Sequence, residues 1–447
     1  MQPVSDASVM IQKIIFVNKL MRCFLRFLFN LLFSMIKPFF RLFLLRLYNK
    51  NRIFGREFFC RKYYCKWKKY ATLNRYKEAP MKIEETILNN FTLTYPLERL
   101  APLDQILFLD IETTGFTPAS SQLYLIGCAF FREGNWHIKQ WFAQSSEEEP
   151  ELLKAFFSFA REFSYLIHYN GNAFDLPYLK QKVIAYELPY SFNGFEGIDI
   201  YRRISPYKNF LKLPNCKLKT IEYFLNIARE DKYTGGELIH VYQDYLSSRD
   251  YTLYHTLLLH NSDDMKGMLE ILPILSYYDL FNNSLKARKV QANYYNDIHG
   301  IPRRALLMKL IFSSALPVSI TAMGKGCHFK GEGHEGTLII PIYEEELKYF
   351  YANYKDYYYL PTEDIAMHKS IASFVDREYR EQAGASTCYT RKFSSYLPQW
   401  KILVEPFFKR EYKSNELFFE LTDEIKKDRQ LFSDYASHVL NVMATQP

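Results

Sequence analysis

One short string, LFLDIETTG at residues 107–115, constrains the fold of this chain more than any other feature. Its apolar residues predict a buried strand at Ile106–Ile111 that ends in a turn. Side chains two positions apart on a strand point to the same face, so Asp110 and Glu112 should project together where the strand ends. Two carboxylates placed in this way can share a divalent cation. The competing interpretation, two solvated acids on an edge strand, explains the spacing of the acids but not the whole DIETTG string.

The segments around this strand have the order of an α/β domain with a mixed sheet. Three antiparallel strands come first, and helices then alternate with strands. The expected strands are Ile106–Ile111, Leu123–Phe131, Trp136–Phe142, Tyr165–Tyr169 and Gly197–Ile200. The expected helices begin at Ser146 and near Phe174, and three more cover Leu218–Ile227, Glu237–Ser247 and Thr252–Tyr278.

Two further strings place acids on expected helices. HYNGNAFDLP, at residues 168–177, places Asp175 at the start of a helix directly after an apolar strand. Capping of that helix by Asn or Asp is the alternative interpretation. LHNSDDM, at residues 259–265, places Asp264 on a long helix, where acids on a solvated face are the alternative. Taken separately, both strings are ambiguous.

Taken together, the three strings resemble the motifs of the DEDD-type 3′-5′ exonucleases, whose fold is ribonuclease H-like. The order of strands and helices is also the one expected of a ribonuclease H-like mixed sheet with flanking helices. Together with the string NCKLKTIE from Asn215, these strings more closely resemble the YprB-like ribonuclease H branch. The resemblance covers about Met81 to Phe281.

The resemblance implies a phosphodiesterase in which four carboxylates surround two Mg²⁺ or Mn²⁺ ions. These residues are Asp110, Glu112, Asp175 and Asp264. Oxygen ligands suit both metals, and two such ions can stabilise the attacking and leaving oxygens of a displacement. Four carboxylates this close together would repel one another strongly without metal. The expected substrate is single-stranded DNA or RNA, or frayed ends, cut from 3′ to 5′.

The sequence departs from the family pattern at the general base. Members usually carry Tyr-x3-Asp or His-x4-Asp at the last acid, whereas this chain has His260-x3-Asp264. We predict Asp264 as a metal ligand and His260 as the base, with a lining role for His260 as the alternative.

Weaker candidates for substrate contacts surround these motifs. Thr113, Asn170, Lys217 and Lys219 are the ones we assign to substrate. Arg202 and Arg203 are further candidates for phosphate contacts, and solvated surface is the competing interpretation for all four basic residues. Six tyrosines between Tyr349 and Tyr359 could stack on bases, although packing is the simpler explanation.

Charge is distributed unevenly along the chain. The whole sequence has 57 basic and 49 acidic residues, a balance of +8. Residues 1–80 hold 17 Lys or Arg and three acids, or +14, which leaves 40 − 46 = −6 for the remainder. The N-terminal segment has three competing interpretations. It could be a basic amphipathic region on an anionic membrane, a nucleic-acid tail, or sequence upstream of a natural start at Met81. We favour the third interpretation.

No stretch of this segment predicts a transmembrane span. Its longest uncharged run, Phe27–Ile36, is ten residues, about half of what a bilayer requires. Seven cysteines without a CxxC pair indicate a reduced, cytoplasmic protein.

We therefore expect three parts: a basic N-terminal extension at 1–80, a ribonuclease H-like domain at 81–282, and a smaller C-terminal α+β domain at 283–447. In the last part we expect strands at Leu316–Met323 and Thr337–Tyr343 and a helix at Ile365–Tyr379. A metal-dependent 3′-5′ exonuclease is the predicted function. The alternatives are a structure-specific endonuclease of the same fold and a catalytically silent nucleic-acid-binding adaptor.

Overall fold

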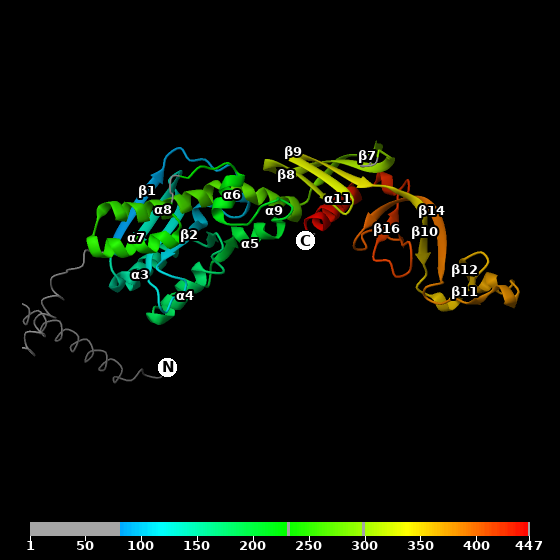
Figure 1. Cartoon of the computed structure of the whole chain (residues 1–447), viewed down its shortest axis with the longest axis horizontal. Coiled ribbons are helices and arrows are strands. Elements are labelled where there is room, and N and C mark those ends of the chain that lie inside the picture. The colour runs from blue at the N-terminus through cyan, green and yellow to red at the C-terminus, as the bar shows by residue number, and fades with distance from the viewer. Residues whose placement is uncertain (1–80, 230–232, 297–299, 446–447) are drawn as a thin grey trace, which may run out of the picture. The chain divides into compact units, whose positions relative to one another are not determined.

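The computed structural model describes residues 81–229, 233–296 and 300–445 (Figure 1). The interpretations of residues 1–80, including membrane contact, lie outside the described residues. Within the described ranges, no helix has both the length and the hydropathy that a membrane crossing requires. The divisions after residues 80 and 282 stay predictions.

A mixed six-stranded sheet forms the first half of the described chain, with the strand order β1-β4-β3-β2-β5-β6. Its members are β1 (Lys82–Leu88), β2 (Ile106–Thr113), β3 (Leu123–Arg132), β4 (Asn135–Phe142), β5 (Tyr165–His168) and β6 (Glu196–Asp199). β1 to β4 pair antiparallel, whereas β5 pairs parallel with both β2 and β6. This is the sheet that the order of the motifs predicts, with one additional strand, β1, that the sequence analysis missed.

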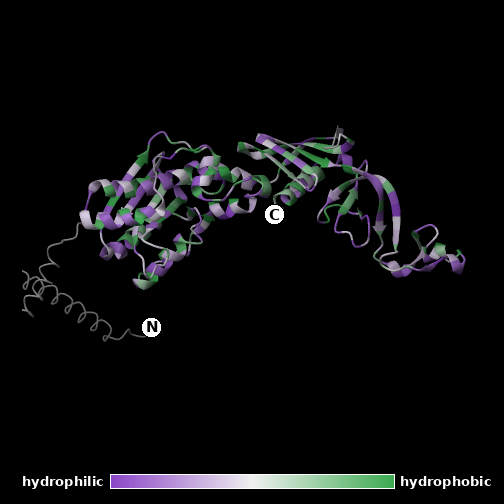
Figure 2. Ribbon diagram, in the orientation of Figure 1, coloured by the Kyte–Doolittle hydropathy of each residue, from purple (hydrophilic) through white to green (hydrophobic). Residues whose placement is uncertain are grey.

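Helices cover both faces of this sheet (Figure 1). On one face, α3 (Glu149–Ala160) and α4 (Asp175–Ala185) pack on the odd-numbered positions of β2, such as Leu107 and Leu109. On the other, α8 (Tyr251–Glu270) packs on the even-numbered Ile106 and Phe108, and α7 (Gly235–Ser248) lies beside it. Both polar and apolar residues occur along these elements (Figure 2). Because a strand alternates its faces, positions 110 and 112 continue the α8 face.

Three shorter helices complete this half: α5 (Ile200–Ile204), α6 (Leu218–Phe224) and α9 (Leu275–Asn282). The single helix expected at Thr252–Tyr278 is wrong, because α8 ends at Glu270 and α9 begins at Leu275. Pro273 lies in the short 3₁₀ turn between them. Proline lacks the N–H that a continuous helix requires.

The remainder of the chain is rich in sheet, as expected of an α+β region. One sheet contains β7 (Lys286–Asn296), β8 (Pro302–Gly324) and β9 (Cys327–Pro341); a second contains β10 (Tyr343–Phe350), β14 (Tyr389–Gln399), β15 (Phe407–Phe408) and β16 (Leu417–Glu420). A third contains β11 (Tyr357–Leu360), β12 (Ile365–His368) and β13 (Glu381–Gln382), and the helices are α10 (Lys369–Ala372) and α11 (Arg429–Ala444).

One prediction for this region is wrong. The helix expected at Ile365–Tyr379 begins instead with β12, which pairs antiparallel with β11, and only α10 is helical in it. Pairing with a neighbouring strand overrides the helical pattern of the sequence here. The tyrosine run lies in β10, β11 and the turn between them, where Tyr351 and Tyr357 stack with ring centroids 4.6 Å apart. Packing thus accounts for this pair.

Candidate metal centre

The first two acids lie on the central strand β2, on the face covered by α8. Asp110 is partly buried and Glu112 is 9% exposed. The pairing of β2 with β3 becomes irregular between Glu112 and Thr113. The carboxylates therefore project where regular pairing ends, between a sheet and a helix.

A relay of amide groups fixes the Asp110 carboxylate. Asn261 of α8 donates from Nδ2 to Asp110 Oδ2 at 2.9 Å, and Gln140 of β4 donates to Asn261 Oδ1 at 2.9 Å. Gly127, which pairs with Asp110 in the sheet, makes the approach of Asn261 possible. A Cβ at position 127 would lie 2.0 Å from Asn261 Oδ1, so any other residue would displace the amide.

Two further side chains come from consecutive turns of α8. His260 Nε2 lies 3.5 Å from Glu112 Oε1 and 3.7 Å from Asp264 Oδ2. Glu112, His260 and Asp264 each offer one possible ligand atom, and these three atoms lie within 4.8 Å of one another. This spacing suits a shared cation. The spacing of four residues on a helix produces this proximity.

The remaining predicted acid, Asp175, lies at the start of α4. Its carboxylate accepts hydrogen bonds from the backbone N–H groups of Ile111 and of Asp175 itself. Burial, and to a smaller extent Asp199, nevertheless raise the pKa of Asp175 to about 7, against the direction of these hydrogen bonds. Asp175 is therefore a carboxyl group that is costly to ionise in the absence of a cation.

Asp199, at the end of β6, holds the loop that delivers Asp175. Its carboxylate accepts from the backbone N–H groups of Asn170 at 3.0 Å and Asn172 at 3.3 Å, and it caps α5. Asn170 has a φ of 62°, in the left-handed region that Asn tolerates. The loop is thus fixed by a buried acid that the sequence analysis did not assign.

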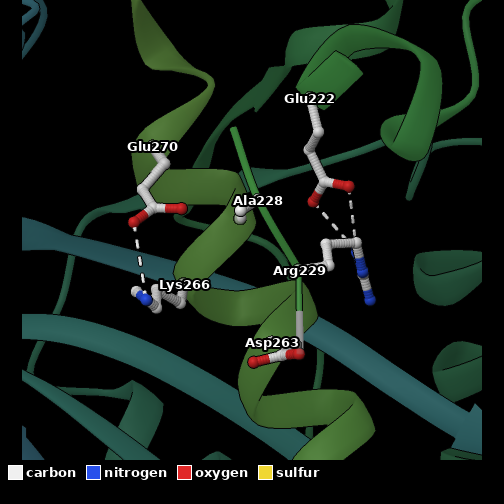
Figure 3. A pocket seen from close by; sticks show the side chains of 7 residues that line it. Glu222, Ala228, Arg229, Asp263, Lys266 and Glu270 are labelled. Carbon is white, nitrogen blue, oxygen red and sulfur yellow. Dashed lines mark hydrogen bonds and ion pairs between the residues drawn. The ribbon is translucent and has the colours of Figure 1, made fainter. Parts of the chain in front are cut away.

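Arg229 links Asp264 to Glu222 of α6 through hydrogen bonds. Its Nη2 donates to Asp264 Oδ1 at 2.5 Å, and its Nη1 donates to both oxygens of Glu222, at 2.9 and 3.2 Å. Figure 3 shows Glu222 facing Arg229 beside a cavity of about 160 Å³, which Lys266 and Glu270 also line. The side chain of Arg229 is 11% exposed, so this is a partly buried ion-pair network.

The carboxylates interact strongly with one another. Burial raises the pKa of Asp110 well above its ordinary value, and the neighbouring Asp264, Glu112 and Asp175 raise it further. All four predicted acids are therefore within electrostatic range. Oxygen donors in a poorly solvated cluster fit a hard divalent cation, which would neutralise the repulsion.

The four residues predicted to contact substrate lie in two parts of the chain. Thr113 donates to the carbonyl of Gly115 at 2.9 Å, and the backbone of Asn170 bonds to Asp199 as described. Lys217 is exposed before α6, and Lys219 donates to the carbonyl of Tyr233 at 2.8 Å. Thr113 and Asn170 thus lie beside the acids in the chain, and both lysines lie at the start of α6.

Residues 107–276 match the family model of the RNase_H superfamily. They form a ribonuclease H-like domain. The ribonuclease H-like fold predicted from the sequence is confirmed for this domain. Its three motifs lie on β2, at the start of α4 and on α8.

The ribonuclease H-like domain also has a curated relative, "Uncharacterized protein YprB" from Bacillus subtilis (strain 168). The two are 27% identical over 174 residues, which is 38% of this chain and 41% of the relative. The match therefore spans less than half of either protein.

Among solved structures, the family B DNA polymerase from Pyrobaculum calidifontis is 14% identical with a TM-score of 0.33, covering 58% of this chain and 37% of the polymerase. E. coli Exonuclease I in complex with a dT13 oligonucleotide is 11% identical with a TM-score of 0.25, covering 47% of this chain and 55% of the exonuclease.

The pKa of Asp175 predicts an unusual pH dependence of stability without metal. The unfolded group has a pKa near 3.8 and the folded group near 7, so between these values the folded state binds the additional proton. The free energy of unfolding, measured with urea in EDTA, should therefore fall as pH rises from about 4 to 7. Asp175→Asn should flatten this slope, and Mg²⁺ or Mn²⁺ should restore stability at neutral pH. An identical slope in wild type and variant would contradict the assignment.

Proposed function

We propose that this chain is a metal-dependent nuclease that hydrolyses phosphodiester bonds at single-stranded or frayed nucleic-acid ends, as a 3′-5′ exonuclease. The proposal is supported by the buried or partly buried cluster of Glu112, His260 and Asp264, whose possible ligand atoms lie within 4.8 Å of one another, and by Asp110, whose pKa is raised by burial and by Asp264, Glu112 and Asp175. A cluster with such a cost of ionisation has no purpose in a metal-free adaptor.

In this proposal the four acids hold two Mg²⁺ or Mn²⁺ ions. When bound, such ions supply positive charge that stabilises the attacking and leaving oxygens of an in-line displacement. Asn261 and Gln140 orient Asp110, and Asp199 orients the loop that carries Asp175. His260, beside Glu112 and Asp264, is placed to accept a proton from the attacking water at Nε2.

An exposed aromatic residue next to the acids favours single-stranded substrate. Phe116 follows the DIETTG string and is 88% exposed, and its ring lies 5.9 Å from that of Phe174, the residue before Asp175. Unpaired bases stack on exposed aromatic rings. A base at a strand end could therefore rest on Phe116 while its phosphate lies at the carboxylates.

A basic segment offers contacts for the phosphate backbone. Residues 200–221 contain six Lys or Arg and no acid, in a region whose overall charge is negative. Tyr169, in the loop that leads to Asp175, donates to the carbonyl of Cys216 in this segment at 2.7 Å. We therefore assign the phosphates upstream of the cut to this segment, with Lys217 and Lys219 among its contacts.

Neutralising Lys212 and Lys217 together, both exposed, should weaken binding of single-stranded DNA by a catalytically inactive Asp110→Asn protein. The slope of log affinity against log salt should become shallower by about 0.7 for each phosphate that the protein no longer neutralises. Fluorescence anisotropy at several salt concentrations measures both quantities. Lys330→Gln, which removes an exposed lysine of β9, is the matched control. Unchanged slopes would exclude the segment as a phosphate contact.

The proposal is tested with the purified full chain on labelled single-stranded DNA and RNA in Mg²⁺, Mn²⁺ or EDTA. A 3′-5′ exonuclease progressively shortens 5′-labelled strands in the presence of metal and leaves circular strands intact. Cleavage of circular strands or branched duplexes would instead indicate the endonuclease. Binding without cleavage under every condition would indicate the adaptor.

A further inference from the structure

The string NCKLKTIE contributes no acid to the proposed metal set, yet its last residue is deeply buried beside that set. Glu222 is 1% exposed, and both of its carboxylate oxygens accept hydrogen bonds from Arg229. Its place beside α8 depends on Gly267, where a Cβ would lie 2.3 Å from Glu222 Oε1. Gly267 is one helical turn from Asp264, so α8 leaves room for Glu222 next to the proposed ligand.

The start of the string fixes its helix. Asn215 Oδ1 accepts from the backbone N–H of Lys217 at 2.9 Å and from the hydroxyl of Thr220 at 2.6 Å. These bonds fix the turn directly before α6, which begins at Leu218 and carries Glu222. The string thus connects this turn to a buried carboxylate, which in turn binds a guanidinium.

The two carboxylate oxygens of Asp264 have different neighbours. The guanidinium holds Oδ1, and Oδ2 lies 3.7 Å from His260 Nε2 on the side of Glu112. A carboxylate fixed through one oxygen presents the other in a defined direction. The fork of an arginine can hold two carboxylates at once, which a single lysine nitrogen does less well.

We propose that Arg229, held by Glu222, is a positioning residue that orients Asp264 for the divalent cation. The inference rests on the proposed function, because it assigns Asp264 to a metal. Partners of metal ligands typically change metal affinity by about 10- to 100-fold when they are removed. The competing view is that the guanidinium opposes the metal by its charge, and it makes the opposite prediction for the variants.

The experiment measures Mn²⁺ affinity of the full chain by electron paramagnetic resonance of the free ion. Arg229→Gln should bind Mn²⁺ about 10- to 100-fold more weakly. Arg229→Lys, which keeps the charge but not the fork, should also bind more weakly, by a smaller factor. In both variants, hydrolysis should recover as Mn²⁺ is raised, which a general loss of packing would not produce.

Two further variants separate the ion pair from its surroundings. Gly267→Ala displaces Glu222 while keeping Arg229 and Asp264, and it should weaken Mn²⁺ binding in the same direction. Lys266→Gln is the matched control: Lys266 lines the same cavity but pairs with Glu270, at 3.7 Å, and should leave Mn²⁺ affinity unchanged. Melting curves in EDTA identify any variant that fails to fold, in which case the remaining variants decide.

The outcomes distinguish this inference from the proposed function on which it rests. If wild type binds Mn²⁺ and cleaves, and the folded Arg229 variants bind Mn²⁺ equally or more tightly, the positioning role is refuted and the nuclease stands. If wild type neither binds Mn²⁺ nor cleaves, the proposed function itself fails.

Discussion

Replacing Asp110 or Asp175 with Asn should reduce hydrolysis by at least about 10³-fold. Stabilisation of transition-state charge by a bound cation contributes several kcal/mol, and about 1.4 kcal/mol corresponds to a factor of ten in rate. The fold should persist, because Asn keeps an oxygen that can accept from Asn261 or from the backbone of Ile111. Initial rates on 5′-labelled single strands and melting curves in EDTA measure the two effects.

Asp104→Asn is the control for this pair, since it removes an exposed carboxylate just before β2. It should leave the rate unchanged. In EDTA at neutral pH, the Asp110 and Asp175 variants should melt at or above the wild-type temperature, because a buried, repelled charge has been removed. Wild-type turnover in either variant would exclude it from the metal centre.

His260→Ala should lower turnover by about 10² to 10⁴, the usual contribution of a general base. Alanine has no group that can accept a proton from the attacking water, so the variant depends on the bound cation alone. His260→Tyr should restore part of the rate, because it recreates the Tyr-x3-Asp pattern that the family resemblance suggests. Turnover numbers of the wild type and the two variants measure these effects.

His255→Ala is the matched control, an exposed histidine on the same helix. Mn²⁺ affinity separates two roles for His260, because it lies within the ligand-atom cluster of Glu112 and Asp264. A large loss of affinity in His260→Ala would make it a ligand. An unchanged rate and an unchanged Mn²⁺ affinity would reduce it to a lining residue.

The parts of the fold and site that follow from local patterns were predictable. A strand with acids two positions apart requires that both carboxylates share a face, and a helix with His and Asp four positions apart requires that they lie on one side. The structure has both arrangements at Asp110 and Glu112 and at His260 and Asp264. The roles of these residues in catalysis remain predictions.

The residues that orient the acids were not predictable, because they act across long separations in the sequence. Gln140 contacts Asn261 over 121 positions, and Asn261 contacts Asp110 over 151. An amide in the middle of a strand or helix gives no local sign of such a partner. Asn261 was part of the third motif, but the motif alone gives it no role.

The missed strand and the wrong helix have different causes. β1 is an edge strand whose middle residues are all exposed, so its sequence lacks the apolar alternation of a half-buried strand. Charged side chains are typical of such edges, where they discourage pairing with other chains. In the C-terminal region, β12 is a strand because β11 lies beside it, and that pairing is not encoded in its own four residues.

The large separation between Asp110 and Asn261 also affects how the protein is made. A chain that emerges from the ribosome exposes β2 and its two acids well before α8 has been synthesised, because synthesis proceeds from the N-terminus. Until α8 packs on the sheet, Asp264 and His260 are absent and Asp110 lacks its amide partner. Nascent chains should therefore lack the complete candidate metal centre until α8 has been synthesised and has packed on the sheet.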